Sequence, residues 1–335
     1  MIVVTGGAGF IGSNLVQALN RSGRTDIWVV DDLQDGRKFA NLADAVIADY
    51  SDSQRFLAWI DSPAAAQAPI ERVFHLGACA VTTTWDGRYM MEVNHEYSKR
   101  LFEYCTGLCI PFIYASSAAV YGTGREFAEA AENERPVNVY GWSKLVFDQF
   151  VRARMGRLHS QVVGLRYFNV YGPREQHKGR MASVVRHLAL QVMSEGRLTL
   201  FGEHDGWGEG QQRRDFVHVD DCNAVALWFA AHPEQSGIFN CGSGQDRSFN
   251  SLARAVADWF GGDIEIGYRS FPGDLVGAYQ SYTRADLTRL RAAGCDIDFR
   301  DLETGVRGYL DMLQAGAEID RGVVASRQRA AERER

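Results

Sequence analysis

Short runs of apolar residues alternate with longer amphipathic stretches through the first half of the chain. The apolar runs have the length and the β-branched content of buried strands, whereas the stretches between them repeat apolar residues at helical spacing. The expected strands cover residues 2–5, 27–31, 72–76, 112–116 and 162–167. The expected helices cover about residues 11–21, 52–61, 88–106 and 139–153. This alternation predicts an α/β protein with a doubly wound parallel sheet.

The regular alternation stops after Pro173. Residues 202–210 are rich in glycine and predict a loop, after which residues 215–229 predict a strand and a helix, and residues 237–241 a short strand. We therefore expect a smaller α/β domain, inserted towards the C-terminal end of the chain. The large domain is expected to cover residues 1–170 and about 215–245, the smaller domain about 171–214 and 246–317, and a flexible charged tail residues 318–335.

The composition is that of an ordinary globular protein, with 46% hydrophobic and 23% charged residues. A net charge of -6 argues against a general affinity for nucleic acid or for an anionic membrane surface. The six cysteines show no spacing typical of zinc, and no metal site is predicted. The chain opens on an apolar strand without the features of an export signal, and no apolar run approaches the ~20 residues of a membrane span. We expect a cytoplasmic protein.

Three glycines lie where the first expected strand gives way to the first expected helix. Gly6, Gly9 and Gly12 are spaced three apart in the segment TGGAGFIG. Residues without a side chain allow a tight turn there and let the backbone approach a pyrophosphate, whose charge is favoured at a helix N-terminus. Because a strand precedes the triplet and a helix follows it, we expect a Rossmann-type dinucleotide site rather than an ordinary turn.

The residues after the second expected strand bear on the form of the dinucleotide. Asp31 ends that strand, where an acidic side chain binds the adenosine ribose hydroxyls of NAD. Arg37 and Lys38 follow closely and would instead bind the 2′-phosphate of NADP, while Asp32 is a second acid at the same place. These residues alone leave the choice between NAD and NADP open.

A serine, a tyrosine and a lysine form the candidate proton-transfer site. Tyr140 and Lys144 are four residues apart on one face of an expected helix, and Ser116 lies at the carboxyl end of an expected strand. A phenol is a poor base at neutral pH, but an adjacent ammonium group favours its phenolate. We expect Tyr140 to act as the acid/base, Lys144 to supply charge and hold the nicotinamide ribose, and Ser116 to bond the reacting oxygen.

Six segments carry a resemblance to a known family. They are YASSAAVYG (114–122), NVYGWSK (138–144), GLRYFNVYGPREQHKGRMASV (164–184), RRDFVHVDD (213–221), GIFNCGSG (237–244) and AYQSYTRADLTRLRAAG (278–294). Together they resemble the extended short-chain dehydrogenase/reductase superfamily. The third and sixth segments resemble, more specifically, its ADP-glyceromanno-heptose 6-epimerase family. The similarity runs from Met1 to about Leu313.

The resemblance implies an isomerase of carbohydrate metabolism. Members of this family epimerise the nucleotide sugar ADP-D-glycero-β-D-manno-heptose at C6 to ADP-L-glycero-β-D-manno-heptose, for the inner core of lipopolysaccharide. The implied route is transient oxidation to a 6-keto sugar and re-reduction on the other face with one bound NADP. The resemblance also implies a homo-oligomer, commonly a homopentamer, in which the large domain binds NAD(P) and the smaller domain binds substrate.

The resemblance further implies a set of site residues. Lys178 joins Tyr140 as an acid/base, with Ser116 and Lys144 supporting both. The cofactor is expected to contact Gly6, Gly9, Phe10, Ile11, Gly12, Asp31, Asp32, Lys38, Leu76, Gly77, Ala78, Cys79, Ala80, Lys144, Val170 and Lys178. The ADP-sugar is expected to contact Asn169, Arg180, His187, Phe201, Gly202, Glu203, His204, Arg214 and Tyr279.

Three positions depart from the pattern of that family. Leu76 stands where a glutamate is usual, Val93 where an asparagine is common, and Arg180 where a serine often contacts substrate. The departures weaken the contacts implied at these positions. An arginine at position 180 is, however, able to bind a substrate phosphate.

Three other functions share part of the same pattern. A nucleotide-sugar 4,6-dehydratase would need the two acidic residues that its signature places where this chain has Ala118 and Ala119. A UDP-hexose 4-epimerase shares the serine, tyrosine and lysine, but the segment around His177 and Lys178 argues against it. A non-catalytic NADP-sensing protein typically loses the tyrosine or the lysine of the pair, and both are present here.

Overall fold

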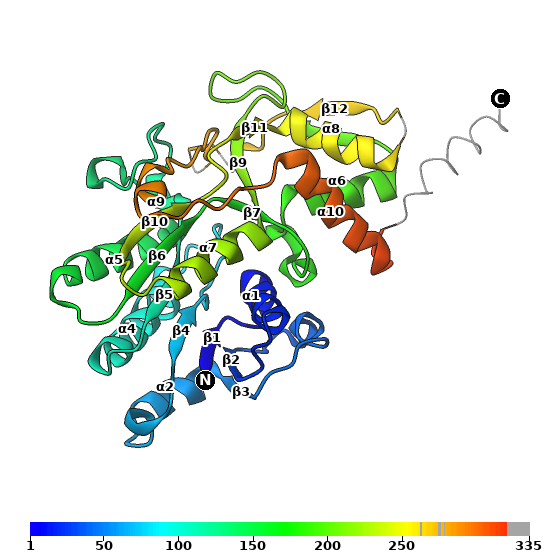
Figure 1. Ribbon diagram of the computed structural model, residues 1–335. Helices are drawn as coiled ribbons and strands as arrows, with labels where there is room; N and C mark the ends of the chain where they lie inside the picture. Colours follow the sequence, from blue (N-terminus) through cyan, green and yellow to red (C-terminus); the bar gives the residue numbers. More distant parts are fainter. Residues whose placement is uncertain (262, 274–275, 278, 320–335) are drawn as a thin grey trace, which may run out of the picture.

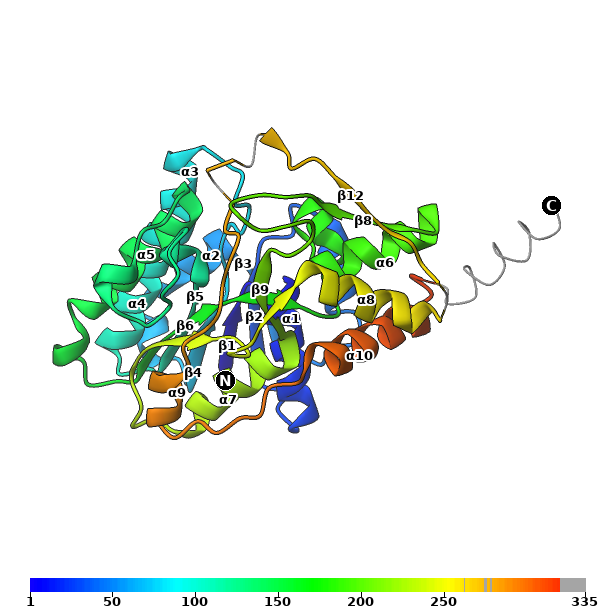
Figure 2. The same cartoon turned by 90° about the horizontal axis from the view of Figure 1, so that it is seen from above.

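The structure is a computed structural model that describes residues 1–261, 263–273, 276–277 and 279–319. Within these residues, a large sheet with helices on both faces lies beside a smaller unit of helices and short strands (Figures 1 and 2). Of the tail expected at residues 318–335, residues 320–335 lie outside the described part. In the part that is described, no helix combines the length and the apolar character that a membrane crossing requires.

The large sheet contains seven parallel strands among the described residues. In sheet order they are β10 (Gly237–Cys241), β6 (Val162–Tyr167), β5 (Phe112–Ser117), β4 (Arg72–His75), β1 (Ile2–Thr5), β2 (Ile27–Asp31) and β3 (Asp49–Asp52). Each strand pairs in parallel with its neighbours, which confirms the predicted doubly wound sheet. The sequence did not predict β3, because its residues are polar and none of them is buried.

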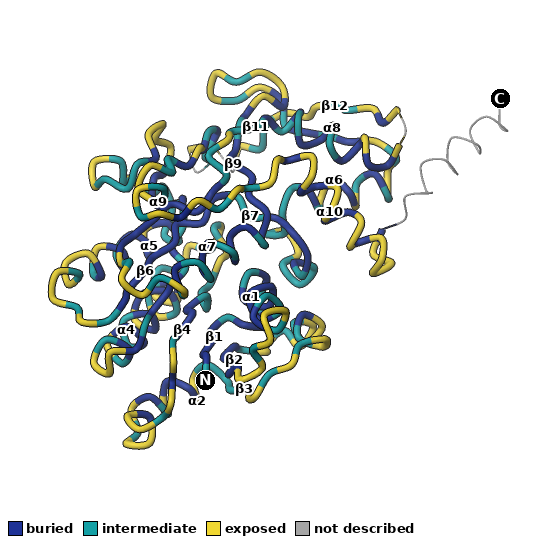
Figure 3. The backbone as a smooth tube through the Cα atoms, viewed as in Figure 1, coloured by how far each residue is buried: buried dark blue, intermediate teal, exposed yellow. Residues whose placement is uncertain are grey.

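Helices cover both faces of this sheet because its strands, apart from the edge strand β3, bury apolar residues on both sides. One layer contains α1 (Phe10–Arg21) and α7 (Val219–Ala231), and the other contains α2 (Ser53–Ile60), α3 (Gly87–Met91), α4 (Tyr97–Gly107) and α5 (Val139–Arg152). Successive residues of β1 point to opposite faces, so that Val4 packs in the first layer and Val3 in the second. The buried residues follow the sheet through the centre of the molecule (Figure 3).

The C-terminal part is more regular than the sequence indicated. Its strands are β7 (Asn169–Tyr171), β9 (Arg213–His218) and β11 (Asp246–Ser248) in one sheet, and β8 (Leu198–Phe201) and β12 (Ile266–Arg269) in another. Its helices are α6 (Val184–Glu195), α8 (Phe249–Phe260) and α10 (Leu302–Ala315), which share one apolar core, and α9 (Thr288–Ala292), which lies against β10. The boundaries expected for the two domains stay a prediction.

Short helical turns complete the described structure. A π-helical turn, Glu92–Glu96, joins α3 to α4. The 3₁₀ turns are η1 (Gly36–Asn41), η2 (Ala65–Gln67), η4 (Ala118–Tyr121), η5 (Ala131–Asn133), η6 (Met155–Arg157) and η7 (Gln176–Met181). Two of them, η1 and η7, carry residues that the sequence assigns to the site.

Candidate active site

The glycine triplet forms a cradle where β1 passes into α1. Gly6 has a φ of 66°, and a side chain there would come within 2.6 Å of the backbone of Gly77. A side chain on Gly12 would come within 2.1 Å of the carbonyl oxygen of Gly6. Gly9 caps α1 without a side chain, and the first turn of the helix has no acidic residue. The helix start therefore favours an anion such as the pyrophosphate of a dinucleotide.

An aspartate and a lysine meet beside this cradle at the end of β2. The N–H of Ala8 donates to Asp31 Oδ2 at 2.8 Å, and Lys38 Nζ donates to Asp31 Oδ1 at 3.0 Å. Burial raises the pKa of Asp31. Burial also lowers the pKa of Lys38, but the carboxylates of Asp31 and Asp32 outweigh it and raise that pKa overall. Arg37 is exposed and pairs with a neighbouring aspartate instead.

The residues after β4 form the next wall of the site. Gly77 lies against the cradle, and Leu76 packs against the apolar core that α1 and α7 share. The N–H of Cys79 donates to Asn94 Oδ1 at 2.8 Å, and Asn94 Nδ2 donates to Cys79 O at 3.0 Å and to Ser143 Oγ at 3.0 Å. Asn94 thus ties this loop to α5. Asn94 was not predicted as a site residue. Val93 stands where an asparagine is common in the family, and in this chain the asparagine is the next residue.

Tyr140 and Lys144 lie on α5, as the sequence predicts. Burial raises the pKa of Tyr140, and a hydrogen bond with the Ser117 side chain opposes that rise. Burial lowers the pKa of Lys144 to about 8. Lys144 Nζ donates to the Ala115 carbonyl oxygen at 2.9 Å, so this bond directs the ammonium group to the end of β5. Contrary to expectation, burial and not the charge of Lys144 dominates the pKa of Tyr140.

Ser116 is not the hydroxyl beside Tyr140. The side chain of Ser116 is 3% exposed and donates to Asp148 Oδ2 at 2.9 Å. Neighbouring residues of a strand point to opposite faces, so Ser117 is the serine whose hydroxyl reaches Tyr140. The expectation that Ser116 lies beside Tyr140 is therefore wrong, and Ser117 takes that place.

Lys178, the second predicted acid/base, lies in η7. Its Nζ is 4.9 Å from the centre of the Phe10 ring, and Phe10 is the first residue of α1. Burial lowers the pKa of Lys178, and the carboxylate of Glu175 opposes that shift. The structure thus places Lys178 beside the dinucleotide cradle.

Arg214 is a buried cation on β9. Its guanidinium carbon lies 4.7 Å from the centre of the Tyr279 ring, and burial lowers its pKa. Its Nη1 has no hydrogen-bond partner among the described residues. A buried, unpaired N–H group is costly, and a bound anion would satisfy it. Arg214 therefore suits a phosphate group of a nucleotide.

Aromatic rings gather around Arg214. Tyr279 is 6.4 Å from Phe201 and 6.2 Å from His204, measured between ring centres. His204 in turn stacks on Phe271 with ring centres 3.6 Å apart. Phe271 was not predicted, because no motif marks it in the sequence. This cluster offers flat apolar surfaces of the kind that hold a nucleotide.

The remaining predicted residues have varied surroundings. Asn169 donates to Asp215 O at 3.2 Å and to Thr283 Oγ1 at 3.0 Å, which ties β7 to the loop before α9. Arg180 and His187 are exposed, and His187 Nε2 lies 3.3 Å from the Arg180 carbonyl oxygen. Glu203 is exposed, Gly202 is buried and Val170 packs against the core of the large sheet.

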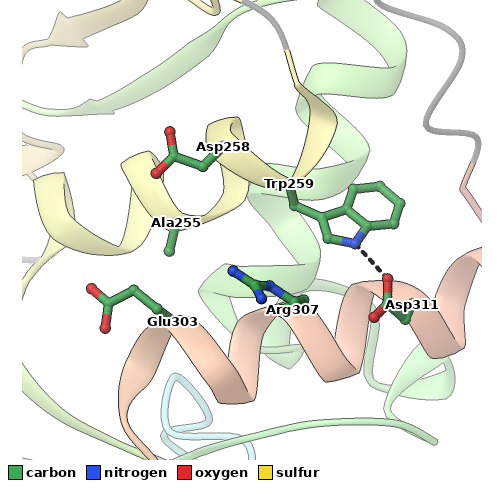
Figure 4. Close-up of a pocket in the computed structure, with 6 residues that line it drawn as sticks. All are labelled: Ala255, Asp258, Trp259, Glu303, Arg307 and Asp311. Atoms are coloured by element: carbon green, nitrogen blue, oxygen red, sulfur yellow. Dashed lines mark hydrogen bonds between the residues drawn. The ribbon is translucent and has the colours of Figure 1, made fainter.

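A separate hollow lies between α8 and α10 and has a volume of about 350 Å³ (Figure 4). Its lining residues are Ala255, Asp258, Trp259, Glu303, Arg307 and Asp311. Trp259 Nε1 donates to Asp311 Oδ1 at 2.7 Å across the hollow. The residues predicted from the sequence do not include any of these six. The hollow is therefore distinct from the candidate active site.

Residues 2–242 match the pattern of the NAD dependent epimerase/dehydratase family. The chain belongs to this family. Members use a nicotinamide dinucleotide, and the cradle before α1 fits the pyrophosphate of such a cofactor. The sequence-based prediction of a nicotinamide cofactor is confirmed to this extent.

Several proteins resemble this epimerase/dehydratase family member along nearly its whole length. The ADP-L-glycero-D-manno-heptose-6-epimerase of Alkalilimnicola ehrlichii is 62% identical over 314 residues, which are 93% of this chain and 97% of that protein. The enzyme of the same name from Pseudomonas aeruginosa is 54% identical over 331 residues, 94% of this chain and 99% of that protein. A crystal structure of the Helicobacter pylori ADP-L-glycero-D-manno-heptose-6-epimerase superimposes with a TM-score of 0.79 at 32% identity, covering 94% of this chain and 96% of that one. The resemblance inferred from the motifs is confirmed.

Proposed function

We propose that the chain is an ADP-L-glycero-D-manno-heptose 6-epimerase, which inverts C6 of ADP-D-glycero-β-D-manno-heptose. The observation that carries the proposal is that two proton-transfer candidates from different parts of the chain lie beside segments that border the dinucleotide cradle. Tyr140 comes from α5, beside the loop that touches Gly6, and Lys178 comes from η7, beside Phe10. The 62% identity to a 6-epimerase over most of the chain supports the choice of substrate.

Two acid/base groups suit an inversion at a carbon that bears a hydroxyl. The bound nicotinamide supplies the capacity to accept a hydride from C6 and to return it. Tyr140 Oη would take the hydroxyl proton of one epimer, with the Ser117 hydroxyl bonded to the same oxygen. Lys178 Nζ would serve the hydroxyl of the other epimer, and its lowered pKa makes the neutral amine accessible. The 6-keto sugar stays bound while it presents its second face.

Binding of the ADP portion would fall to the C-terminal part of the site. The Arg214 guanidinium has a free Nη1 for a phosphate oxygen, and the rings of Phe201, His204 and Tyr279 offer stacking surfaces. These contacts would anchor the nucleotide while the heptose turns.

Further parts of the proposal concern the cofactor form and the setting. We propose NADP, because Lys38 supplies a half-buried cation at the end of β2, where a 2′-phosphate would lie. By resemblance to its family, the enzyme would work in the cytoplasm as a homo-oligomer, commonly a homopentamer, in lipopolysaccharide synthesis. No nucleic acid or membrane partner is proposed.

The test is to incubate the purified protein with ADP-D-glycero-β-D-manno-heptose and to separate the two 6-epimers. We expect a mixture of both epimers without added NADP, because the redox cycle closes on bound cofactor. In deuterated water, C6 of the product should carry no deuterium. A demand for stoichiometric cofactor would point to a net dehydrogenase, and solvent deuterium at C6 would exclude oxidation and reduction. UDP-glucose is the control substrate, and its turnover instead would favour a 4-epimerase.

A further inference from the structure

Asn41 is a fully buried polar residue between the phosphate cradle and the segment of Lys178. Its Nδ2 donates to the Ala8 carbonyl oxygen at 2.9 Å, and its Oδ1 accepts from Gln176 Nε2 at 3.0 Å. Nδ2 also lies 3.1 Å from His177 Nδ1. Asparagine is mostly exposed in proteins, so a buried one with three bonds points to a specific role. These bonds join the glycine turn to the two residues that precede Lys178.

The bonds of Asn41 also fix the state of His177. One hydrogen of Asn41 Nδ2 points to the Ala8 carbonyl, so the other points to His177 Nδ1, which must accept. Burial, together with the charges of Lys38 and Lys178, lowers the pKa of His177 to about 4. The ring is neutral at pH 7, as this bond requires. A reversed amide would set Oδ1 against the Ala8 oxygen, and two acceptors repel.

The backbone of Asn41 holds the same segment. Arg174 Nη1 donates to the Asn41 carbonyl oxygen at 2.6 Å, and Arg174 Nη2 pairs with Asp44 Oδ2 at 2.6 Å. Arg174 has a φ of 68°, a left-handed conformation that costs a residue with a side chain about 1–2 kcal/mol. Such a conformation persists only where its surroundings support it. The segment before Lys178 is thus docked on the connection between β2 and β3.

We propose that Asn41 is a positioning residue for Lys178. It is the last residue of η1, the turn that carries Lys38, and its side chain donates a hydrogen bond to the Ala8 carbonyl oxygen in the cradle. Through this amide, together with the Arg174 contacts, the placement of the cradle and of η1 sets where Lys178 stands above the Phe10 ring. Asn41 acts on the reaction only through Lys178. The inference rests on the proposed function, because it assigns Lys178 a part in the epimerisation.

The test is a double-mutant cycle between positions 41 and 178. Asn41→Ala should lower kcat about 10²-fold, the cost of a misplacement of about 1 Å, with KM for ADP-heptose and the affinity for NADP within about threefold. In a Lys178→Met background, Asn41→Ala should lower kcat by less than about threefold relative to Lys178→Met alone, as measured in single turnovers. A merely structural role would instead make the two losses multiply. Multiplying losses, or near-native kcat in Asn41→Ala, would overturn the proposal.

The chain offers a matched control and a gentler variant. Asn20 also makes three side-chain bonds, to Arg24 O and to both backbone groups of Val46, and none of them reaches η7. Asn20→Ala should leave kcat near native. Gln176→Ala removes only the bond that Asn41 Oδ1 accepts and keeps both bonds that Asn41 donates, and it replaces Asn41→Ala in the cycle if the latter does not fold. Failure of the proposed function would differ, since the wild-type protein itself would not turn over ADP-heptose.

Discussion

Two adjacent serines at the end of β5 have opposite surroundings. The Ser117 side chain bonds Tyr140, whereas the Ser116 hydroxyl donates to the buried Asp148 carboxylate. Ser117→Ala should therefore lower kcat about 10²–10³-fold, as the loss of a group that bonds the reacting oxygen does. Ser116→Ala should keep kcat within about tenfold but lose about 1.5–3 kcal/mol of stability, because Asp148 loses a donor.

Steady-state kinetics and urea unfolding of the two variants provide the measurement. Each serine variant is the control for the other, since both remove one hydroxyl from the same strand. Loss of kcat in Ser116→Ala with an active Ser117→Ala would restore the original assignment.

The serine pair also shows how far residues can be assigned from the sequence. Tyr140 and Lys144 lie on one helix as predicted, because a spacing of four residues on a helix is a local property. The choice between Ser116 and Ser117 depends on where the strand ends, and β5 extends one residue beyond the expected 112–116. The surroundings of Lys178 and Arg214 include the rings of Phe10 and Tyr279, which are far away in the sequence. Periodicity alone does not reveal such contacts.

At the level of elements, one buried carboxylate holds α5 against β5 and β6. Asp148 on α5 accepts from Tyr114 at 2.9 Å and from Arg166 Nε at 2.9 Å, and both Asp148 and Arg166 are 0% exposed. Asp148→Ala would leave Arg166 with Glu134 as its carboxylate partner and would remove the acceptor of the Tyr114 and Ser116 hydroxyls. We expect a loss of about 3–5 kcal/mol in the free energy of unfolding, the usual cost of breaking a buried ion pair.

This expectation is tested by chemical denaturation of Asp148→Ala, compared with that of a variant that breaks an exposed ion pair. Arg100 pairs with Asp61 on the surface, so Asp61→Ala should change stability by at most about 1 kcal/mol. A loss below about 1 kcal/mol for Asp148→Ala would show that the carboxylate is not what joins α5 to the sheet.

The elements differ in how well their sequences reveal them. The five apolar strands and the helices that cover them were predicted to within a few residues. Their buried residues form recognisable patterns in the sequence, because side chains alternate along a strand and recur about every 3.6 residues in a helix. The polar strand β3 was missed, since it pairs at the sheet edge through its backbone. The helices α6, α8 and α10 are each continuous over 12 to 14 residues, and they were missed because short strands of three to six residues lie between them along the chain. Their shared core joins residues from 171 to 319, and nothing local marks it.

For the whole molecule, buried neutral histidines link stability to pH. His75 lies 2.6 Å from Thr5 Oγ1 and 2.8 Å from Ser98 Oγ, and burial, helped by the charge of Lys144, lowers its pKa to about 3. His218 Nδ1 accepts from Arg300 Nη1 at 2.7 Å, and burial lowers its pKa to about 4. Both rings must stay neutral in the folded chain.

The sign of the pH effect follows from these pKa values. The ordinary pKa of histidine is about 6.5, and the pKa values of the two rings in the folded chain are about 3 and 4. Between these values the unfolded chain binds more protons than the folded chain, so the free energy of unfolding falls as the pH falls. At pH 5, about 1.5 units below the ordinary pKa, each histidine lowers the free energy of unfolding by about 2 kcal/mol, because one pKa unit corresponds to about 1.36 kcal/mol. Asp215 opposes this, because burial raises its pKa to about 6 and favours folding at low pH by about 1 kcal/mol at pH 5. We expect a net loss of about 3 kcal/mol between pH 7.5 and pH 5 from these three groups.

His218 allows this expectation to be tested with one substitution. Its Nδ1 caps α7 by accepting from the N–H of Asp220 at 3.2 Å, and asparagine is among the best residues at a helix N-cap. His218→Asn therefore keeps an acceptor at the start of α7 but cannot take up a proton. Urea unfolding at pH 7.5 and pH 5 measures how much free energy of unfolding is lost between these two pH values. This loss should be about 2 kcal/mol smaller in His218→Asn than in the wild-type chain. An unchanged pH dependence would mean that His218 takes up its proton at the same pH in the folded and the unfolded chain, and that folding does not lower its pKa.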